Sequence, residues 1–225
     1  ADVPAVTLRS AAAALQNYTP ELAQAVREGE SKTDHYEDIL GTYLVKLSAL
    51  KISENDSSEA AMLLKALSDF ERIGDHALNI LESAEELKCK NLSLSDAARH
   101  ELSVLLRAVD EIVDMTFQAF RDDDLEKAYR VEPLEQVIDD LKEKMRIHHI
   151  LRMQQGSCSI ESGFVWSDLL TALERVGDHC SNIAGCIIDL HHHNMNTHEA
   201  IRSARMENEN FDDEYKAYAV KYSLK

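Results

Sequence analysis

Two acidic pairs in this sequence have a spacing that could bind a cation. Glu71 and Asp75 are four residues apart, and so are Glu174 and Asp178. On a helix, four residues make about one turn, which places the two side-chain roots about 5–6 Å apart on one face. Carboxylates at that distance repel each other, whereas a cation between them attracts both, and hard or borderline metal ions bind oxygen ligands. The spacing therefore indicates a metal site at each pair.

The two pairs belong to an internal repeat. Residues 71–76 read Glu-Arg-Ile-Gly-Asp-His, and residues 174–179 read Glu-Arg-Val-Gly-Asp-His, 103 positions later. A single acidic pair is usually a solvated helix face, but its recurrence in a shared frame favours the metal hypothesis. Upstream of these pairs, Glu37 is matched by the acidic residue Asp139 at an offset of 102. We therefore predict metal ligands at Glu71, Asp75, Glu174 and Asp178, assisted by Glu37 and Asp139 from the preceding helices.

The other residues of the frame leave alternatives open. His76 and His179 could be further metal ligands, although local hydrogen bonds are the more common role. Gly74 and Gly177 each cost about 1 kcal/mol in a helix interior, so we expect close helix packing at both. The chain lacks a Glu-x-x-His motif at these positions, which counts against the redox chemistry of ferritin-like di-iron enzymes.

Composition predicts that helices position these residues. The 225 residues include only 7 Gly and 3 Pro, fewer than sheets and hairpins require, so we predict an all-α protein. Apolar residues recur at helical spacing and indicate six long helices, at about 4–17, 19–49, 58–88, 93–122, 123–154 and 161–193. The repeat groups them as two tandem three-helix bundles. The predicted divisions are 1–90, 91–194 and a polar C-terminal tail, 195–225, with a short helix near 215–222.

Three local features give further expectations. Pro133 should kink the fifth helix or split off its first turn. The second helix should bury a stripe formed by Val26, Tyr36, Leu40, Tyr43 and Leu47. The first helix has only about half the length of its repeat partner, the fourth, and the chain lacks an initiator Met. These two features predict a chain cut from a longer protein, with an incomplete first bundle.

Charge excludes several classes of function. The net charge of −17 repels nucleic acid and anionic lipid headgroups and favours cations or a basic partner surface. The four cysteines form no CxxC pair, no apolar run approaches the length of a membrane span, and no signal peptide is visible. No Ser-His-Asp arrangement, nucleotide loop or activated cysteine stands out. We therefore expect a protein that is not an enzyme.

The segments 67–80 and 173–184, which contain the two repeated frames, resemble the signature of the PhoU family. The resemblance covers about residues 20–194. It implies two three-helix bundles, and multinuclear metal clusters, with iron in some members, at the two Glu-x-x-x-Asp motifs. Those motifs correspond to Glu71, Asp75, Glu174 and Asp178. The implied cofactor is therefore iron or another divalent or trivalent cation.

A narrower resemblance concerns the segments 36–48, 131–135 and 211–215, which are similar to the PhoU-like C-terminal region of bacterial sodium/phosphate cotransporters. It implies a regulatory domain on the cytoplasmic side of the cell membrane, with the membrane domain of a phosphate transporter as its partner. Two alternatives stay open. One is a free-standing PhoU regulator of an ABC phosphate importer and its sensor kinase, and the other is a carboxylate-bridged metal enzyme such as a phosphatase. The oligomeric state is open too, homo-oligomers included.

Overall fold

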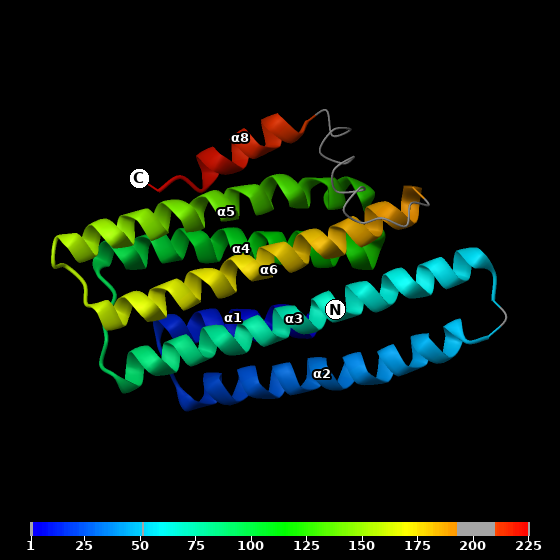
Figure 1. The fold of residues 1–225 in the computed structure, drawn as a ribbon, viewed down its shortest axis with the longest axis horizontal. Helices are drawn as coiled ribbons and strands as arrows, with labels where there is room; N and C mark the ends of the chain where they lie inside the picture. The colour runs from blue at the N-terminus through cyan, green and yellow to red at the C-terminus, as the bar shows by residue number, and fades with distance from the viewer. Residues whose placement is uncertain (1, 51, 193–209, 225) are drawn as a thin grey trace.

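The computed structural model describes residues 2–50, 52–192 and 210–224, and the regular structure in these ranges is entirely α-helical (Figure 1). This confirms the all-α prediction. The helices are α1 (Asp2–Gln16), α2 (Pro20–Ser48), α3 (Glu54–Cys89), α4 (Asp96–Asp122), α5 (Leu125–Gln154), α6 (Ile160–His192) and α8 (Phe211–Lys221).

The six long helices form two bundles of three. Each of α1, α2 and α3 packs against the other two, and α4, α5 and α6 do the same. The bundles are joined mainly through α3 and α6, which lie side by side at the centre of the molecule (Figure 1). The predicted boundary at 90/91 falls in the connection between α3 and α4. The predicted boundary at 194/195 lies outside the described residues.

Capping residues explain where the helices begin. The Thr19 side chain accepts a hydrogen bond from the first turn of α2, and Pro20 occupies the first helical position. The predicted start of the third helix, near residue 58, is wrong. Ser53 and Asp56 form a reciprocal capping box, so α3 begins one turn earlier, at Glu54.

Two outcomes were predicted at Pro133, a kink or a separate first turn. Helix α5 continues through Pro133, so its first turn is not separate. A proline removes one backbone hydrogen bond from a helix. Its neighbours Val131 and Leu134 are fully buried, and α5 packs on both α4 and α6. Tertiary packing of this kind supplies most of the stability of a protein helix, and here it offsets the lost bond.

The centre of the molecule is an apolar seam between repeat-related residues. Ile73 and Ile80 of α3 correspond to Val176 and Ile183 of α6, and all four side chains are fully buried. Burying an aliphatic side chain of this size contributes about 1.5–3 kcal/mol. All four residues belong to the common core of the molecule, in which α3 packs against α6.

The first bundle is covered along only part of its length. Thr7 of α1 lies against Gly29, near the middle of α2, and α1 begins at Asp2, little more than one turn further on. The end of the α2–α3 hairpin therefore extends beyond α1 (Figure 1).

This geometry makes the predicted stripe of α2 wrong in its second half. Val26 is fully buried beside α1, and Leu47 is half-buried. The remaining stripe residues are exposed, at 53%, 45% and 61% of their surface for Tyr36, Leu40 and Tyr43. The spacing is helical as predicted, but no third helix among the described residues covers that face.

The C-terminal segment is not simply a polar tail. Helix α8 lies along α5 (Figure 1), and it buries Tyr218, with Tyr222 buried just beyond its end. Lys221 also contacts Glu111 of α4 at 2.6 Å. The predicted short helix exists, but it begins at Phe211 and packs against the second bundle. Within the described ranges, none of the helices combines the length and the apolar character that crossing a membrane requires.

Candidate functional site

Three carboxylates meet in the seam between α5 and α6. Glu135 and Asp139 lie one turn apart on α5, and Asp178 faces them from α6. One oxygen atom of each lies within 4.8 Å of one from each of the others, and all three residues are half-buried. Gly177 sits opposite this turn of α5, with Ile138 and Glu135 as its nearest neighbours across the seam. A compact set of oxygen donors of this kind suits a hard metal ion.

Glu174 lies beside this cluster and is only partly balanced. Its Oε1 atom contacts Lys142 Nζ at 2.8 Å. Its Oε2 atom is buried and accepts no hydrogen bond among the described residues, although Arg175 Nε lies 3.9 Å away. Arg175 contacts Asp178 at 3.2 Å from the solvent side. A buried carboxylate oxygen that accepts no hydrogen bond is costly, and a cation bound there would add a close interaction.

The electrostatics of the seam agree with its geometry. Burial raises the pKa of Asp178 above its usual value, and the charge of Glu174 raises it further. Burial and Glu174 also raise the pKa of Asp139, although Lys142 opposes them. The raised pKa values mean that the ionised carboxylates are disfavoured, first by loss of water and next by the neighbouring negative charge. The residues present therefore fit a bound cation.

The first bundle gathers the predicted residues more loosely. Burial raises the pKa of Glu71, followed by the effect of Asp75, with a smaller contribution from Glu37. Burial and Asp75 likewise raise the pKa of Glu30 on α2. These acidic groups therefore share one environment across the α2–α3 seam. However, no three potential ligand atoms in the described part of this bundle lie within 4.8 Å of one another.

Substitutions between the repeats explain the difference. Glu135 corresponds to Thr33 at the offset of 102, and Lys142 corresponds to Leu40. The buried Thr33 side chain donates to a backbone carbonyl on its own helix, so the first bundle lacks the third carboxylate. Glu135 is not among the metal ligands predicted from the sequence. Its spacing of four residues from Asp139, the same as in the two repeated pairs, was the available signal.

The two histidines of the repeated frame lie at the α3–α6 seam. His179 Nδ1 lies 2.8 Å from Asp69 Oδ1, and Asn182 donates to the same oxygen at 3.1 Å. The ring of His76 stacks on that of His179 with centroids 5.3 Å apart. Burial, followed by the proximity of His179, lowers the pKa of His76 to about 4. These contacts favour the hydrogen-bonding and packing alternative over metal ligation.

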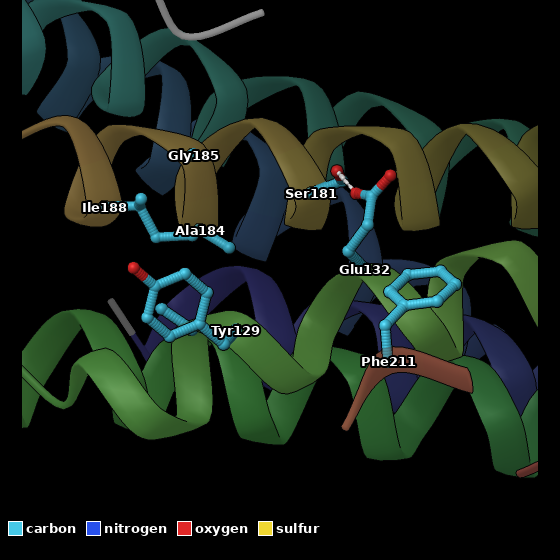
Figure 2. A pocket seen from close by; sticks show the side chains of 8 residues that line it. Tyr129, Glu132, Ser181, Ala184, Gly185, Ile188 and Phe211 are labelled. Carbon is cyan, nitrogen blue, oxygen red and sulfur yellow. Dashed lines mark hydrogen bonds between the residues drawn. The ribbon is translucent and has the colours of Figure 1, made fainter. Parts of the chain in front are cut away.

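Glu132, another acidic residue of α5, has a serine as its partner. Ser181 Oγ donates to Glu132 Oε2 beside a cavity between α5, α6 and the first residue of α8 (Figure 2). Tyr129, Ala184, Ile188 and Phe211 surround the rest of this cavity. Its volume is about 10 Å³, at the lower limit for one water molecule. This cavity is therefore part of the packing of α8 and too small for an organic ligand.

Two three-helix bundles, joined at repeated Glu-Arg-x-Gly-Asp-His frames with acidic seams, define a class of duplicated helical proteins. The family model described as "PhoU domain" matches residues 5–84 and 102–187, one copy in each bundle. The chain belongs to the PhoU family. The family match confirms the resemblance to the PhoU family that the segments 67–80 and 173–184 carry.

Individual relatives agree with the family match. The chain is 33% identical over 131 residues to "Phosphate-specific transport system accessory protein PhoU homolog 1" from Thermotoga maritima, covering 56% of this chain but only 53% of that protein. It is 29% identical over 182 residues to "Phosphate-specific transport system accessory protein PhoU" from Serratia marcescens, covering 78% and 72%. The crystal structure of PhoU from Pseudomonas aeruginosa superposes with a TM-score of 0.79 at 25% identity, covering 85% of this chain and 91% of that one.

Proposed function

We propose that this chain regulates phosphate transport by binding to a component of a transport system rather than by catalysing a reaction. The observation that carries the proposal is the pair of PhoU segments, one in each bundle. The names of its relatives, accessory proteins of the phosphate-specific transport system, support the same role.

The names of the relatives also favour one of the two kinds of phosphate transporter that the sequence left as possible partners. They agree better with the free-standing regulator of a phosphate importer than with the domain of a sodium/phosphate cotransporter. The regulator of a phosphate-specific transport system is therefore our main proposal, and the cotransporter domain is the alternative. The net charge of −17 favours a basic partner surface in either case, because opposite potentials steer association.

We further propose that a divalent or trivalent cation binds between α5 and α6. The supporting observations are the three clustered carboxylates and the buried Oε2 atom of Glu174, which accepts no hydrogen bond among the described residues. A bound cation would neutralise the seam and could bridge an anion that the acidic surface otherwise repels. Glu71, Asp75 and Glu37 are proposed as a second site, which lacks the third clustered carboxylate.

Transport into vesicles tests the proposed function. Phosphate uptake is measured in vesicles that contain an ABC phosphate importer and, separately, in vesicles that contain a sodium/phosphate cotransporter, with the purified chain added at the cytoplasmic face. We expect a change in rate or apparent affinity in the first set. The effect should weaken as salt rises, because exposed charges are screened beyond about 8–10 Å at physiological ionic strength.

The other possible results of these measurements separate the proposal from its alternatives. An effect only on the cotransporter would establish the alternative context. No effect on either transporter, with binding to neither, would overturn the regulatory proposal. Steady hydrolysis of a phosphoester by the metal-loaded chain would overturn the proposal that it acts by binding and would favour the metal-enzyme hypothesis.

A further inference from the structure

A cavity lies between the second half of α5 and the first half of α6, beside the connection that joins the two helices. Its volume is about 460 Å³, within the range of sites that enclose small organic molecules. The antiparallel pairing of the helices sets its direction. Lys142 contacts Glu174 at 2.8 Å near one end, and His149 lies against Gly163 toward the other. The cavity therefore follows the α5–α6 seam away from the carboxylate cluster.

The lining of the cavity changes from polar to apolar along this direction. The polar part, nearer the carboxylate cluster, is lined by Lys142, Arg146, Ser167 and Thr171. The apolar part, nearer the helix connection, is lined by Ile150, Met153, Ile160 and Phe164. The charged side chains among the described lining residues are both cationic. This distribution complements a molecule that has an apolar body and an anionic head.

Two buried ring nitrogens at the cavity have no hydrogen-bond partner among the described residues. They are Nε2 of His149 and Nε1 of Trp166, and both residues line the cavity while being only 8% and 2% exposed. Their rings stack with centroids 6.1 Å apart, one helical turn from Arg146. An indole nitrogen can only donate a hydrogen bond, so Trp166 lacks an acceptor. A ligand that carries an acceptor group would supply it.

The first bundle shows that the fold does not require this lining. Five lining residues that carry a hydrogen-bonding side chain all correspond to leucine in the first repeat. At the offsets of 102 and 103, Lys142, Arg146, His149, Trp166 and Ser167 correspond to Leu40, Leu44, Leu47, Leu63 and Leu64. Helices of the same family frame therefore pack with leucine at these positions. The hydrogen-bonding groups are a specific property of the cavity in the second bundle.

We propose that this cavity binds a small amphiphilic anion, a monocarboxylate with an alkyl chain. Arg146 would meet the carboxylate, because its present contact with Glu143, at 3.7 Å between two exposed side chains, is weak, whereas Lys142 keeps its ion pair with Glu174. The alkyl chain would cover Ile160 and Phe164, which are 69% and 68% exposed, and burial of apolar surface is favourable.

The free molecule is the proposed ligand, and a lipid bilayer is not. The net charge of −17 repels an anionic membrane surface, and the Trp166 nitrogen lies below the protein surface. This inference does not depend on phosphate transport, because binding is measured on the chain alone.

The fluorescence of Trp166 tests the proposal. It is the only tryptophan of the chain, so a change in its emission reports on this cavity. Three ten-carbon probes differ only in the head: decanoate, decanol and decyltrimethylammonium, each used below the concentration at which it forms micelles. We expect a saturable change with decanoate, at least tenfold weaker binding of decanol, and no saturable change with the cation. Decanoate should also raise the melting temperature, because it binds the folded chain.

Variants at exposed positions locate the two parts of the ligand. Arg146→Gln should weaken decanoate binding at least fivefold and leave decanol unchanged, and Arg146→Lys should restore most of the loss. Phe164→Gln should weaken both probes. Ile147→Gln is the matched control, because this side chain of α5 is 55% exposed and lies outside the cavity lining. Circular dichroism checks that each variant is folded.

Four results would overturn the proposal. Equal binding of decanoate and decanol would mean that apolar contact alone drives association. Unchanged decanoate binding in Arg146→Gln would place the carboxylate elsewhere. A response to phosphatidylglycerol vesicles but not to decanoate would identify a membrane-binding surface. No change in emission or melting temperature with decanoate would show that the cavity does not bind an alkyl carboxylate.

Discussion

At the scale of single residues, the α5–α6 seam concentrates more negative charge than its neighbours balance. The pKa values of Asp139 and Asp178 are both raised, first by burial and next by Glu174. Ionised carboxylates held in this state oppose folding unless a cation or a proton compensates them. The same side chains should therefore affect stability in opposite directions with and without metal.

The first prediction concerns these carboxylates. In chelator-treated protein, Asp178→Asn should leave the free energy of unfolding unchanged or raise it by a few tenths of a kcal/mol, because a repulsion is relieved. In metal-loaded protein, the same substitution should lower both stability and the metal content of the second bundle. Urea denaturation and elemental analysis measure the two effects. Glu59→Gln, at an exposed position of α3, is the control, and a loss of stability without metal would contradict the prediction.

A companion prediction concerns the first bundle. The double substitution Glu71→Ala and Asp75→Ala should remove the metal that binds there and leave the second site filled. Elemental analysis of protein purified without chelator or nickel resin measures the change. Unchanged metal content would exclude these two residues as ligands.

A third prediction concerns acid stability. Burial lowers the pKa of His149, Arg152 lowers it further, and Glu101 opposes both. An unfolded histidine has a pKa of about 6.5. The buried imidazole therefore contributes stability that is present above about pH 6.5 and lost as the pH falls toward the lowered value. The free energy of unfolding should fall less between pH 7 and pH 5 in His149→Gln than in the wild type.

A neighbouring variant separates this effect from packing. Met153 lies on the same side of α5 and faces Gly163, as His149 does. Met153→Gln should lower stability equally at both pH values, because it removes contacts without a proton. Parallel pH curves for the wild type and His149→Gln would show that this histidine is not responsible.

At the scale of helices, a glycine that the sequence analysis did not single out has the tightest environment. A Cβ atom at Gly29 would lie 2.0 Å from Thr7 Oγ1, whereas one at Gly74 would lie 3.6 Å from Thr33. Gly29→Ala should therefore cost about 1–3 kcal/mol by overpacking α1 against α2. Gly74→Ala should be neutral or gain up to about 1 kcal/mol of helix propensity. Thermal denaturation compares them, and equal effects would contradict this account.

The helices also show which features could be predicted from the sequence. The predicted helix starts at about 19 and 123 agree with α2 and α5, because the caps at Thr19 and Asp124 depend on neighbours within three residues. The exposure of Tyr36 and Tyr43 depends on how far α1 reaches, which the stripe of α2 does not encode. The third seam carboxylate, Glu135, was missed because its repeat partner is Thr33. A repeat reveals only the ligands that both copies share.

At the scale of the whole molecule, α8 fastens the C-terminal segment onto the second bundle. Tyr218 is its main buried anchor, and its hydroxyl group lies near Arg130 of α5 and Met115 of α4. Tyr218→Ala should release α8 because little else on that helix is buried. Hydrogen exchange should rise across 211–221 while α1–α6 stay protected. Val220→Ala, at a position that is 77% exposed, is the control, and a protected α8 in Tyr218→Ala would contradict the prediction.

The hydrogen bond between Asp69 and His179 makes the two halves of the chain unequal. The residue of the second repeat that corresponds to Asp69 is Ala172, so the hydrogen bond across the α3–α6 seam is made once and has no mirror image. In a symmetric dimer of two identical chains, every substitution appears on both sides of the axis. A single chain that contains both halves is free of that restriction. One half can hold a three-carboxylate cluster while the corresponding residues of the other half differ, and a change that benefits one need not damage the other.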